Sequence, residues 1–193
     1  MSIMRFVETR GAVLIGGRSR RMGTPKHLLP KGEVTWIEHI VSTLQSCLPQ
    51  VILVGDGCLP RPLSGLIRLD DLPNRPGPLG GMLAAMHWKP DSDWVFAACD
   101  LPLITPAAVS WLLDQPTPGV LAVMPQLPGA ASPEPLLAYY SCRCRIPLEN
   151  CTAPVQLLDT KLVRTPVPPP NLAQAWININ TPEQAALLQQ NCA

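Results

Sequence analysis

"VLIGGRSRRMGTPKHLL", residues 13–29, begins as a short apolar run and stops abruptly at two adjacent glycines. Glycines let the backbone approach a ligand closely, and the N–H groups of such a loop can form an anion-binding nest. Guanidinium groups add planar donors suited to phosphate oxygens, and a lysine adds a mobile positive charge. The stretch therefore predicts a buried strand that runs into a phosphate-binding loop. The cations of that loop are Arg18, Arg20, Arg21 and Lys26.

Neither of the two best-known phosphate loops fits this spacing. Gly23 is followed by Thr-Pro-Lys-His, whereas a Walker loop requires Gly-Lys followed by Ser or Thr. The adjacent pair Gly16 and Gly17 breaks the G-x-G-x-x-G dinucleotide fingerprint, which excludes a hydride-transferring dehydrogenase. A basic surface loop is the alternative, and a glycine bend with four cations at a strand end argues against it.

The length and composition of the chain bound its class. It has 193 residues, of which 47% are hydrophobic and 15% charged, so we expect one globular domain over residues 1–193. The net charge of +1 gives no overall field for nucleic acid or an anionic membrane surface. Because the sequence has neither a secretory signal nor an apolar run of about 18 residues, we expect a soluble, cytoplasmic protein.

Seven cysteines in a chain without an export signal are expected to be reduced thiols. Cys142, Cys144 and Cys151 lie close together in the sequence, which raises the alternative of a metal site. The standard ligand spacing and a fourth ligand are not evident there, so ordinary thiols are the preferred interpretation.

Short apolar runs alternate with helical segments along the chain. Thr35 and Glu38 form a capping box, and Thr105 and Thr181 are expected N-caps, each followed by a proline. The expected strands are 11–15, 51–55, 65–69, 93–100, 119–124 and 175–180, with an antiparallel strand at 135–141 as a further candidate. The expected helices are 35–48, 81–88, 105–115 and 181–190.

This alternation predicts an α/β fold with a mostly parallel sheet that is covered on both faces. In such sheets ligands bind outside the carboxyl ends of the strands. We therefore expect three loops, distant in sequence, to share one edge of the sheet. They are the loop after Ile15, the loop after Leu69 and the loop that begins at Asp100.

The second of these loops reads "DDLPNRPGPLGGM", residues 70–82, and begins with the acidic pair Asp70 and Asp71. Its glycines suit a close approach of the backbone to a flat ligand. The alternative is a Pro/Gly turn with two solvated acids. These glycines are Gly77, Gly80 and Gly81.

Asp100 follows a buried strand, where a carboxylate is costly unless it is paired, hydrated or bound to a cation. Opposite a cationic phosphate loop, a role as a Mg²⁺ ligand suits it, whereas Thr105 is the better N-cap for the next helix. Asn178 and Asn180 would point to opposite faces of a regular strand. We expect one of them, Asn180, to supply a neutral oxygen ligand; a helix-capping loop is the alternative.

Four motifs carry a resemblance to a known family. "LIGGRSRRMGTPK" resembles the L-A-G-G-x-S-x-R-M-G-x-D-K signature of molybdenum cofactor guanylyltransferases, which belong to the wider nucleotidyltransferase superfamily. "GPLGG", "CDLP" and "NINTP" resemble the family's later motifs and occur in the right order. The resemblance implies a three-layer α/β/α, nucleotide-diphospho-sugar-transferase-like (Rossmann-like) fold. It also implies a nucleotide-binding half at about residues 1–105 and an acceptor-binding half at about 106–193.

The activity implied by the resemblance is transfer of GMP from Mg-GTP to molybdenum-molybdopterin, which forms the molybdopterin guanine dinucleotide cofactor and pyrophosphate. Other molybdenum cofactor biosynthesis proteins and apo-molybdoenzymes are the implied protein partners, with no nucleic acid and no membrane. One alternative is a related nucleotidyltransferase that uses CTP or a sugar phosphate. Another is a nucleotide-binding cofactor chaperone without catalytic activity.

The resemblance also implies roles for individual residues. The implied catalytic residues are Arg21, Lys26 and Asp100, and the implied magnesium ligand is Asp100. The expected nucleotide-binding residues are Leu14, Ile15, Gly16, Gly17, Lys26, Asp70, Asp71 and Asp100, where the choice between the two adjacent aspartates stays open.

The chain departs from the family pattern at three places. Ile15 stands where the family has alanine, and its larger side chain would narrow the base pocket. Pro25 replaces the aspartate that precedes the motif lysine. Val54 or Gly55 stands where some relatives have an asparagine that reads guanine.

Overall fold

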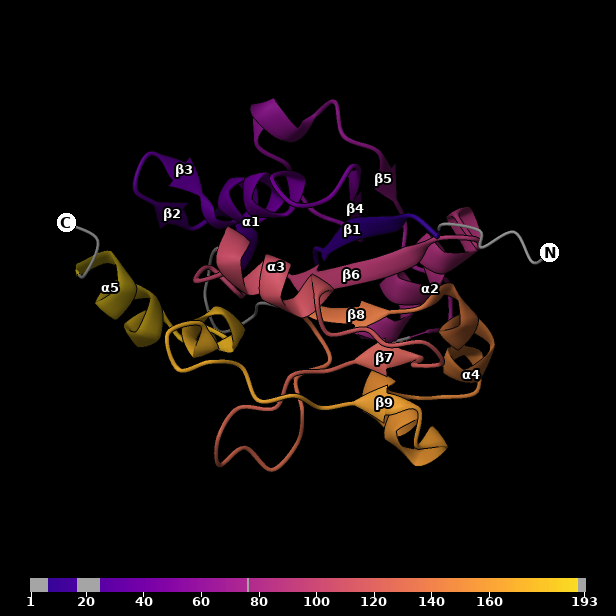
Figure 1. Cartoon of the computed structure of the whole chain (residues 1–193). Coiled ribbons are helices and arrows are strands. Elements are labelled where there is room, and N and C mark those ends of the chain that lie inside the picture. Colours follow the sequence, from indigo (N-terminus) through magenta and orange to yellow (C-terminus); the bar gives the residue numbers. More distant parts are fainter. Residues whose placement is uncertain (1–6, 17–24, 76, 191–193) are drawn as a thin grey trace.

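A seven-stranded sheet forms the middle layer of the computed structural model, which describes residues 7–16, 25–75 and 77–190 (Figure 1). Its strands are, in spatial order, β5 (Arg68–Leu69), β4 (Val51–Val54), β1 (Thr9–Leu14), β6 (Asp93–Ala98), β8 (Ala138–Tyr140), β7 (Ala122–Val123) and β9 (Val163–Arg164). β5, β4, β1 and β6 run parallel to one another. β8 is antiparallel to both β6 and β7, and β9 is parallel to β7. This confirms the mostly parallel sheet and the antiparallel strand expected at 135–141.

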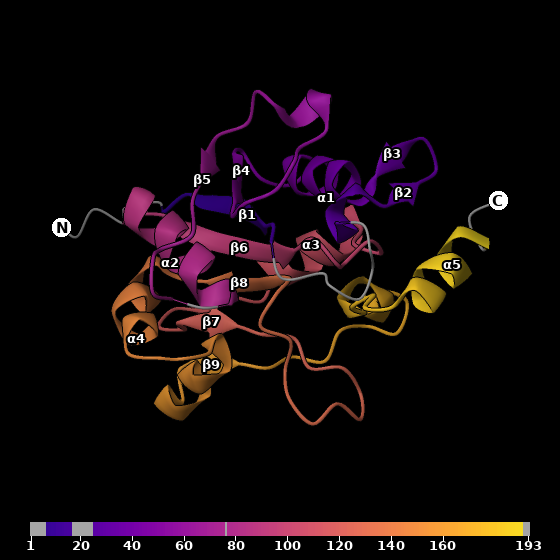
Figure 2. The same cartoon turned by 180° about the vertical axis from the view of Figure 1, so that it is seen from behind.

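Helices cover both faces of the sheet and make the outer layers (Figure 2): α1 (Trp36–Gln45), α2 (Pro78–Trp88), α3 (Pro106–Leu113) and α4 (Arg145–Glu149). Alternate residues of β1 point to opposite layers. Val13, and Ile15 directly after the strand, pack in the core beside α1 and α3, whereas Ala12 and Leu14 pack in the core beside α2 and α4. Both faces of the strand are therefore buried, which is why its sequence reads as a continuous apolar run.

The remaining elements are short or terminal. α5 (Pro182–Gln190) closes the described chain, and β2 (Pro30–Lys31) pairs with β3 (Val34–Thr35) in a small hairpin. The short 3-10 helices are η1 (Lys26–Leu28), η2 (Arg61–Leu63), η3 (Cys142–Cys144), η4 (Pro154–Thr160) and η5 (Ala173–Trp176). Within the described residues, no helix is long and apolar enough to cross a membrane. The described cysteines are free thiols, and no group of three or more His, Cys, Asp or Glu side chains among the described residues is arranged to hold a metal ion.

The helix starts follow the capping signals in the sequence. A carboxylate oxygen of Glu38 accepts the backbone N–H of Thr35 at 2.7 Å, and the Thr35 hydroxyl oxygen accepts the N–H of Glu38 at 3.4 Å. The hydroxyl oxygen of Thr105 accepts an N–H from the first turn of α3. At the start of α5, the N–H of Thr181 donates to Gln184 Oε1, and the N–H of Gln184 donates to the hydroxyl oxygen of Thr181. These three predicted starts are confirmed.

The prediction of a strand at residues 175–180 is wrong. The segment is η5 followed by irregular backbone, because its polar groups bond to other loops instead of a strand ladder. The indole Nε1 of Trp176 donates to the carbonyl oxygen of Leu137 at 2.8 Å. The N–H of Ile179 donates to the carbonyl oxygen of Asp100 at 2.9 Å. The segment is thus anchored beside the end of β6.

Gly55 provides a test of how the sheet edge is built. Its φ is 109°, and an added Cβ would lie 1.8 Å from the carbonyl oxygen of Ile15. We expect Gly55→Ala to lower the free energy of unfolding by about 3 kcal/mol or more, because both the backbone conformation and the close contact would be strained. Urea denaturation measures this loss.

Gly65→Ala is the matched control, since nothing lies within 4 Å of the Cβ it would add. Its free energy of unfolding should stay within about 0.5 kcal/mol of the wild type. Equal stability of the two variants would contradict the placement of Gly55 against Ile15.

Candidate active site

Backbone hydrogen bonds hold the carboxyl ends of the parallel strands level with one another. The N–H of Ile15 donates to the carbonyl oxygen of Val54 at 2.8 Å, and the N–H of Cys99 donates to that of Leu14 at 3.2 Å. The N–H of Gly55 extends the same edge to β5. The loops that follow β1, β5 and β6 therefore emerge together, as the alternation of strands and helices predicted.

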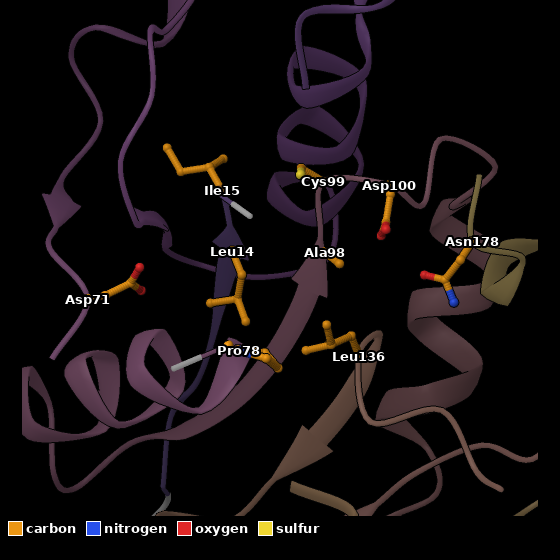
Figure 3. A pocket seen from close by; sticks show the side chains of 11 residues that line it. Leu14, Ile15, Asp71, Pro78, Ala98, Cys99, Asp100, Leu136 and Asn178 are labelled. Atoms are coloured by element: carbon orange, nitrogen blue, oxygen red, sulfur yellow. The ribbon is translucent and has the colours of Figure 1, made fainter. Parts of the chain in front are cut away.

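A cavity of about 310 Å³ opens at this edge (Figure 3). Apolar side chains of Leu14, Pro78 and Leu136 lie in its middle. Asp71 lies at one side, and Asp100 and Asn178 lie at the other, so the polar groups are separated by an apolar surface. The lining residues are Leu14, Ile15, Gly16, Asp71, Gly77, Pro78, Ala98, Cys99, Asp100, Leu136 and Asn178.

The structure thus gathers predicted nucleotide-binding residues from all three loops: Leu14, Ile15, Gly16, Asp71 and Asp100. Other predicted residues of the first loop, Gly17, Arg18, Arg20 and Arg21, lie outside the described residues. Their roles stay predictions.

Lys26 bridges two of the predicted polar residues. Its Nζ donates to Asn180 Oδ1 at 2.6 Å and lies 3.4 Å from Asp100 Oδ2. The Lys26 side chain is 14% exposed and that of Asp100 is 22% exposed, so the ion pair is shielded from most of the solvent. The contact joins the loop after β1, the end of β6 and the segment that precedes α5.

The other carboxylate oxygen of Asp100 has a different environment. Asp100 Oδ1 is buried and has no hydrogen-bond partner in the described part of the chain. A buried carboxylate oxygen without a partner costs free energy, because it has lost its water without gaining a donor or cation. The arrangement leaves one oxygen of Asp100 for a ligand while the other faces Lys26.

Asn178 lines the cavity, whereas Asn180 is exposed. Asn180 also takes part in the start of α5, since its N–H donates to Gln184 Oε1 at 2.7 Å. The two amides do not lie on opposite faces of a strand, because residues 177–180 form no strand. Both side chains reach the same edge of the sheet, Asn178 at the cavity and Asn180 at Lys26.

Glu134 is a neighbour of the site that the sequence did not reveal. Its Oε2 accepts a hydrogen bond from Asn178 Nδ2 at 3.3 Å. Burial raises the pKa of the Glu134 carboxyl, the bond from Asn178 opposes this shift, and the charge of Asp100 adds to it. Glu134 stands in the proline-flanked stretch "SPEPLL", which carries no motif that would mark it as part of a site.

The two adjacent acids of the second loop differ in position. Both side chains are exposed, but Asp71 lines the cavity and Asp70 is not among the lining residues. Burial raises the pKa of the Asp71 carboxyl, and the charges of Asp70 and Asp56 raise it further. The structure thus brings Asp71, and not Asp70, to the cavity.

The glycines of the second loop have two different functions. Gly77 lines the cavity with a φ of 73°. Gly80 and Gly81 instead lie in the first turns of α2, where an added Cβ would lie 2.5 Å from the carbonyl oxygen of Arg75 and 2.9 Å from Asp71 Oδ1, respectively. The absence of a Cβ at these two glycines allows their own loop to pack against α2, and neither is among the residues that line the cavity, so their contact with a ligand stays a prediction.

Comparisons with known proteins agree with this fold. Residues 11–163 match the model of the MobA-like NTP transferase domain family. A probable molybdenum cofactor guanylyltransferase of Bacillus cereus (strain ZK / E33L) is 31% identical over 194 residues, which cover 94% of this chain and 96% of that protein.

Two solved structures share the fold. Molybdopterin-guanine dinucleotide biosynthesis protein A from Archaeoglobus fulgidus superposes with a TM-score of 0.73 at 24% identity, covering 95% of this chain and 98% of that chain. A nucleotidyl transferase from Methanothermobacter thermautotroptrophicus superposes with a TM-score of 0.74 at 18% identity, covering 96% and 97%. The family model spans most of the chain and includes the three loops that meet at the cavity. The chain therefore belongs to the MobA-like NTP transferase family and is a nucleotidyltransferase.

Proposed function

We propose that this nucleotidyltransferase transfers GMP from GTP to molybdenum-bound molybdopterin. A terminal phosphate oxygen of molybdopterin attacks the α-phosphorus, and the bond from that phosphorus to the bridging oxygen of the leaving pyrophosphate breaks. The name of the Bacillus relative supports this choice of substrates. The observation that carries the proposal is the meeting of Lys26 and Asp100 at 3.4 Å beside the cavity, where Asp100 Oδ1 has no hydrogen-bond partner among the described residues.

Lys26 supplies positive charge to the triphosphate. Its ammonium contacts Asp100 and Asn180, and phosphate oxygens would offer it a more highly charged partner. Because the attacking phosphate is already an anion, the reaction needs no strong general base. Catalysis then depends on positioning and on neutralising the charge of the phosphates. Arg21 stays a predicted second cation for the same purpose.

The residues around Asp100 fit a magnesium ion. Its buried oxygen, which has no partner in the part of the chain that the structure describes, is a carboxylate ligand of the kind that Mg²⁺ prefers. In such sites Mg²⁺ takes its other ligands from phosphates and water. Asp100 would hold the ion together with an amide oxygen, either that of Asn178 or that of Asn180 once Lys26 has moved. When bound, Mg²⁺ supplies positive charge to the phosphate oxygens.

Asp71 would read the base at the other side of the cavity. Guanine carries two adjacent donors, N1–H and the N2 amino group, which one carboxylate can accept together, whereas cytosine presents only one amino donor on its pairing edge. Leu14 and Pro78 lie between Asp71 and Asp100 and offer an apolar surface to a flat ring. The carboxylate therefore favours GTP over CTP.

Replacing Lys26 or Asp100 gives the first test of the proposed reaction. We expect Lys26→Ala and Asp100→Ala each to lower kcat/KM for guanylation by about two orders of magnitude, since each removes a group that stabilises charge in the transition state. The assay contains purified protein, Mg²⁺, GTP and molybdenum-loaded molybdopterin, and it measures the release of pyrophosphate.

Arg61→Ala and Asp91→Ala are the matched controls, because they remove an exposed cation and an exposed carboxylate outside the cavity. Both should turn over like the wild type, and thermal unfolding of all four variants checks that they are folded. Near-normal turnover of both Lys26→Ala and Asp100→Ala would refute the assignment.

Replacing Asp71 tests whether the site prefers guanine to cytosine. We expect Asp71→Asn to weaken Mg-GTP binding by roughly tenfold and to leave Mg-CTP binding nearly unchanged, because the amide can accept only on its oxygen. Calorimetric titration of both proteins with each nucleotide gives the four dissociation constants. Tighter binding of CTP than of GTP by the wild type would overturn the choice of base.

The same variant has a pH-dependent effect on stability. Since the folded-state pKa of Asp71 is raised, ionisation of this carboxyl disfavours the folded state, and this cost is absent where the carboxyl is protonated in both states. Relative to the wild type, ligand-free Asp71→Asn should gain stability as the pH rises from about 4 to 7. Urea denaturation across this range measures the difference, and a relative loss with rising pH would contradict the environment described for Asp71.

A further inference from the structure

Glu134 lies behind the cavity wall, in the loop between β7 and β8. Pro133 and Pro135 flank it and restrict the backbone on both sides. Its N–H donates to the carbonyl oxygen of Pro125 at 2.8 Å, which closes the base of the loop. Glu134 is half-buried and is not among the residues that line the cavity, so its carboxylate reaches the site only through a neighbour.

That neighbour is Asn178, and hydrogen bonds of the residues on both sides of it anchor its backbone. Two residues earlier, the indole of Trp176 donates to the carbonyl oxygen of Leu137. One residue later, the N–H of Ile179 donates to the carbonyl oxygen of Asp100. The backbone of Asn178 is therefore tied both to the loop that carries Glu134 and to the end of β6. What these tethers leave undetermined is which end of the Asn178 amide faces the cavity.

The hydrogen bond from Asn178 Nδ2 to Glu134 Oε2 decides this. An ionised carboxylate only accepts hydrogen bonds, so it can pair with the NH₂ end of an amide and not with the carbonyl end. In Figure 3 the amide oxygen of Asn178 accordingly lies on the side of Asp100, while its nitrogen points away. If the amide were flipped, an NH₂ group would face the cavity and two oxygens would face each other.

We propose that Glu134 is a positioning residue that fixes the Asn178 amide with its carbonyl oxygen, and not its NH₂ group, toward Asp100. The inference rests on the proposed function, because an oxygen at this place matters for a magnesium–nucleotide complex. A flipped amide would present hydrogens to the cation. Glu134 thus acts through Asn178 and makes the cavity wall opposite the base an oxygen-donor surface.

The test uses binding of Mn²⁺, as a spectroscopic stand-in for Mg²⁺, in the presence of a non-hydrolysable GTP analogue. Glu134→Leu removes the acceptor and should weaken Mn²⁺ binding about tenfold, measured by electron paramagnetic resonance. Glu134→Gln keeps one oxygen that can accept from Asn178, so it should lose less affinity than Glu134→Leu. Glu33→Leu, at an exposed acid, should bind like the wild type.

A double-mutant cycle separates action through Asn178 from a general structural role. In the Asn178→Ala background, Glu134→Leu should change Mn²⁺ affinity by less than about twofold, because the amide that it orients is gone. An equal loss in both backgrounds, or no loss in either, overturns the inference. Thermal unfolding of each variant identifies any loss that comes from misfolding, and the near-isosteric Glu134→Gln then carries the comparison.

A second readout does not depend on the reaction. In the ligand-free protein, the side-chain NH₂ resonances of Asn178 should shift in Glu134→Gln, and unchanged resonances overturn the inference. If the wild type binds the Mn²⁺–nucleotide complex while the Glu134 variants bind it equally well, only this inference fails. If the wild type binds no such complex, the proposed function fails, whatever the resonances show about the hydrogen bond.

Discussion

The register between β1 and β6 is the constraint on which the site depends. The two strands pair in parallel from Thr9 with Asp93 to Leu14 with Ala98, so they end at the same level of the sheet. A shift of one residue would turn the core-facing side chains of β1 to the wrong layer and move Asp100 away from the first loop. The loop after β1 and the carboxylate after β6 can meet only because this register is fixed.

At that edge, a lysine and an aspartate of opposite charge are in contact, but the hydrogen-bonding capacity of the aspartate is only partly used. Lys26 has two oxygen partners, whereas one oxygen of its partner Asp100 has none among the described residues. Such an arrangement suits a site whose ligand brings both anionic and cationic groups, as a magnesium–nucleotide complex does. The segment before α5 belongs to the same network, because Asn180 contacts Lys26 and Asn178 lines the cavity. Residues near both ends of the sequence therefore lie together at this site.

Much of this architecture could be predicted because it follows from local patterns. Buried strands, capping boxes and the meeting of loops at one edge depend on periodicity and topology, and the sequence motifs located Asp100 and Lys26. The choice between Asp70 and Asp71 could not be predicted, because it depends on how the loop packs against Gly81 of α2.

Other features depend on contacts between distant segments. The segment at residues 175–180 has the composition of a strand, yet tertiary hydrogen bonds from Trp176 and Ile179 draw its backbone away from the sheet. Glu134 meets the cavity wall through its hydrogen bond with Asn178, a residue 44 positions away, and nothing in the sequence around Glu134 indicates this contact.

Following the α-phosphate of GTP tests the proposed transfer of GMP most directly. Protein, Mg²⁺ and molybdenum-loaded molybdopterin are incubated with GTP radiolabelled at the α-phosphate or, in parallel, at the γ-phosphate. Transfer of GMP predicts that the α-label appears in the pterin product and that the γ-label appears only in pyrophosphate. Release of the γ-label as inorganic phosphate, or an unlabelled pterin with either substrate, would contradict it.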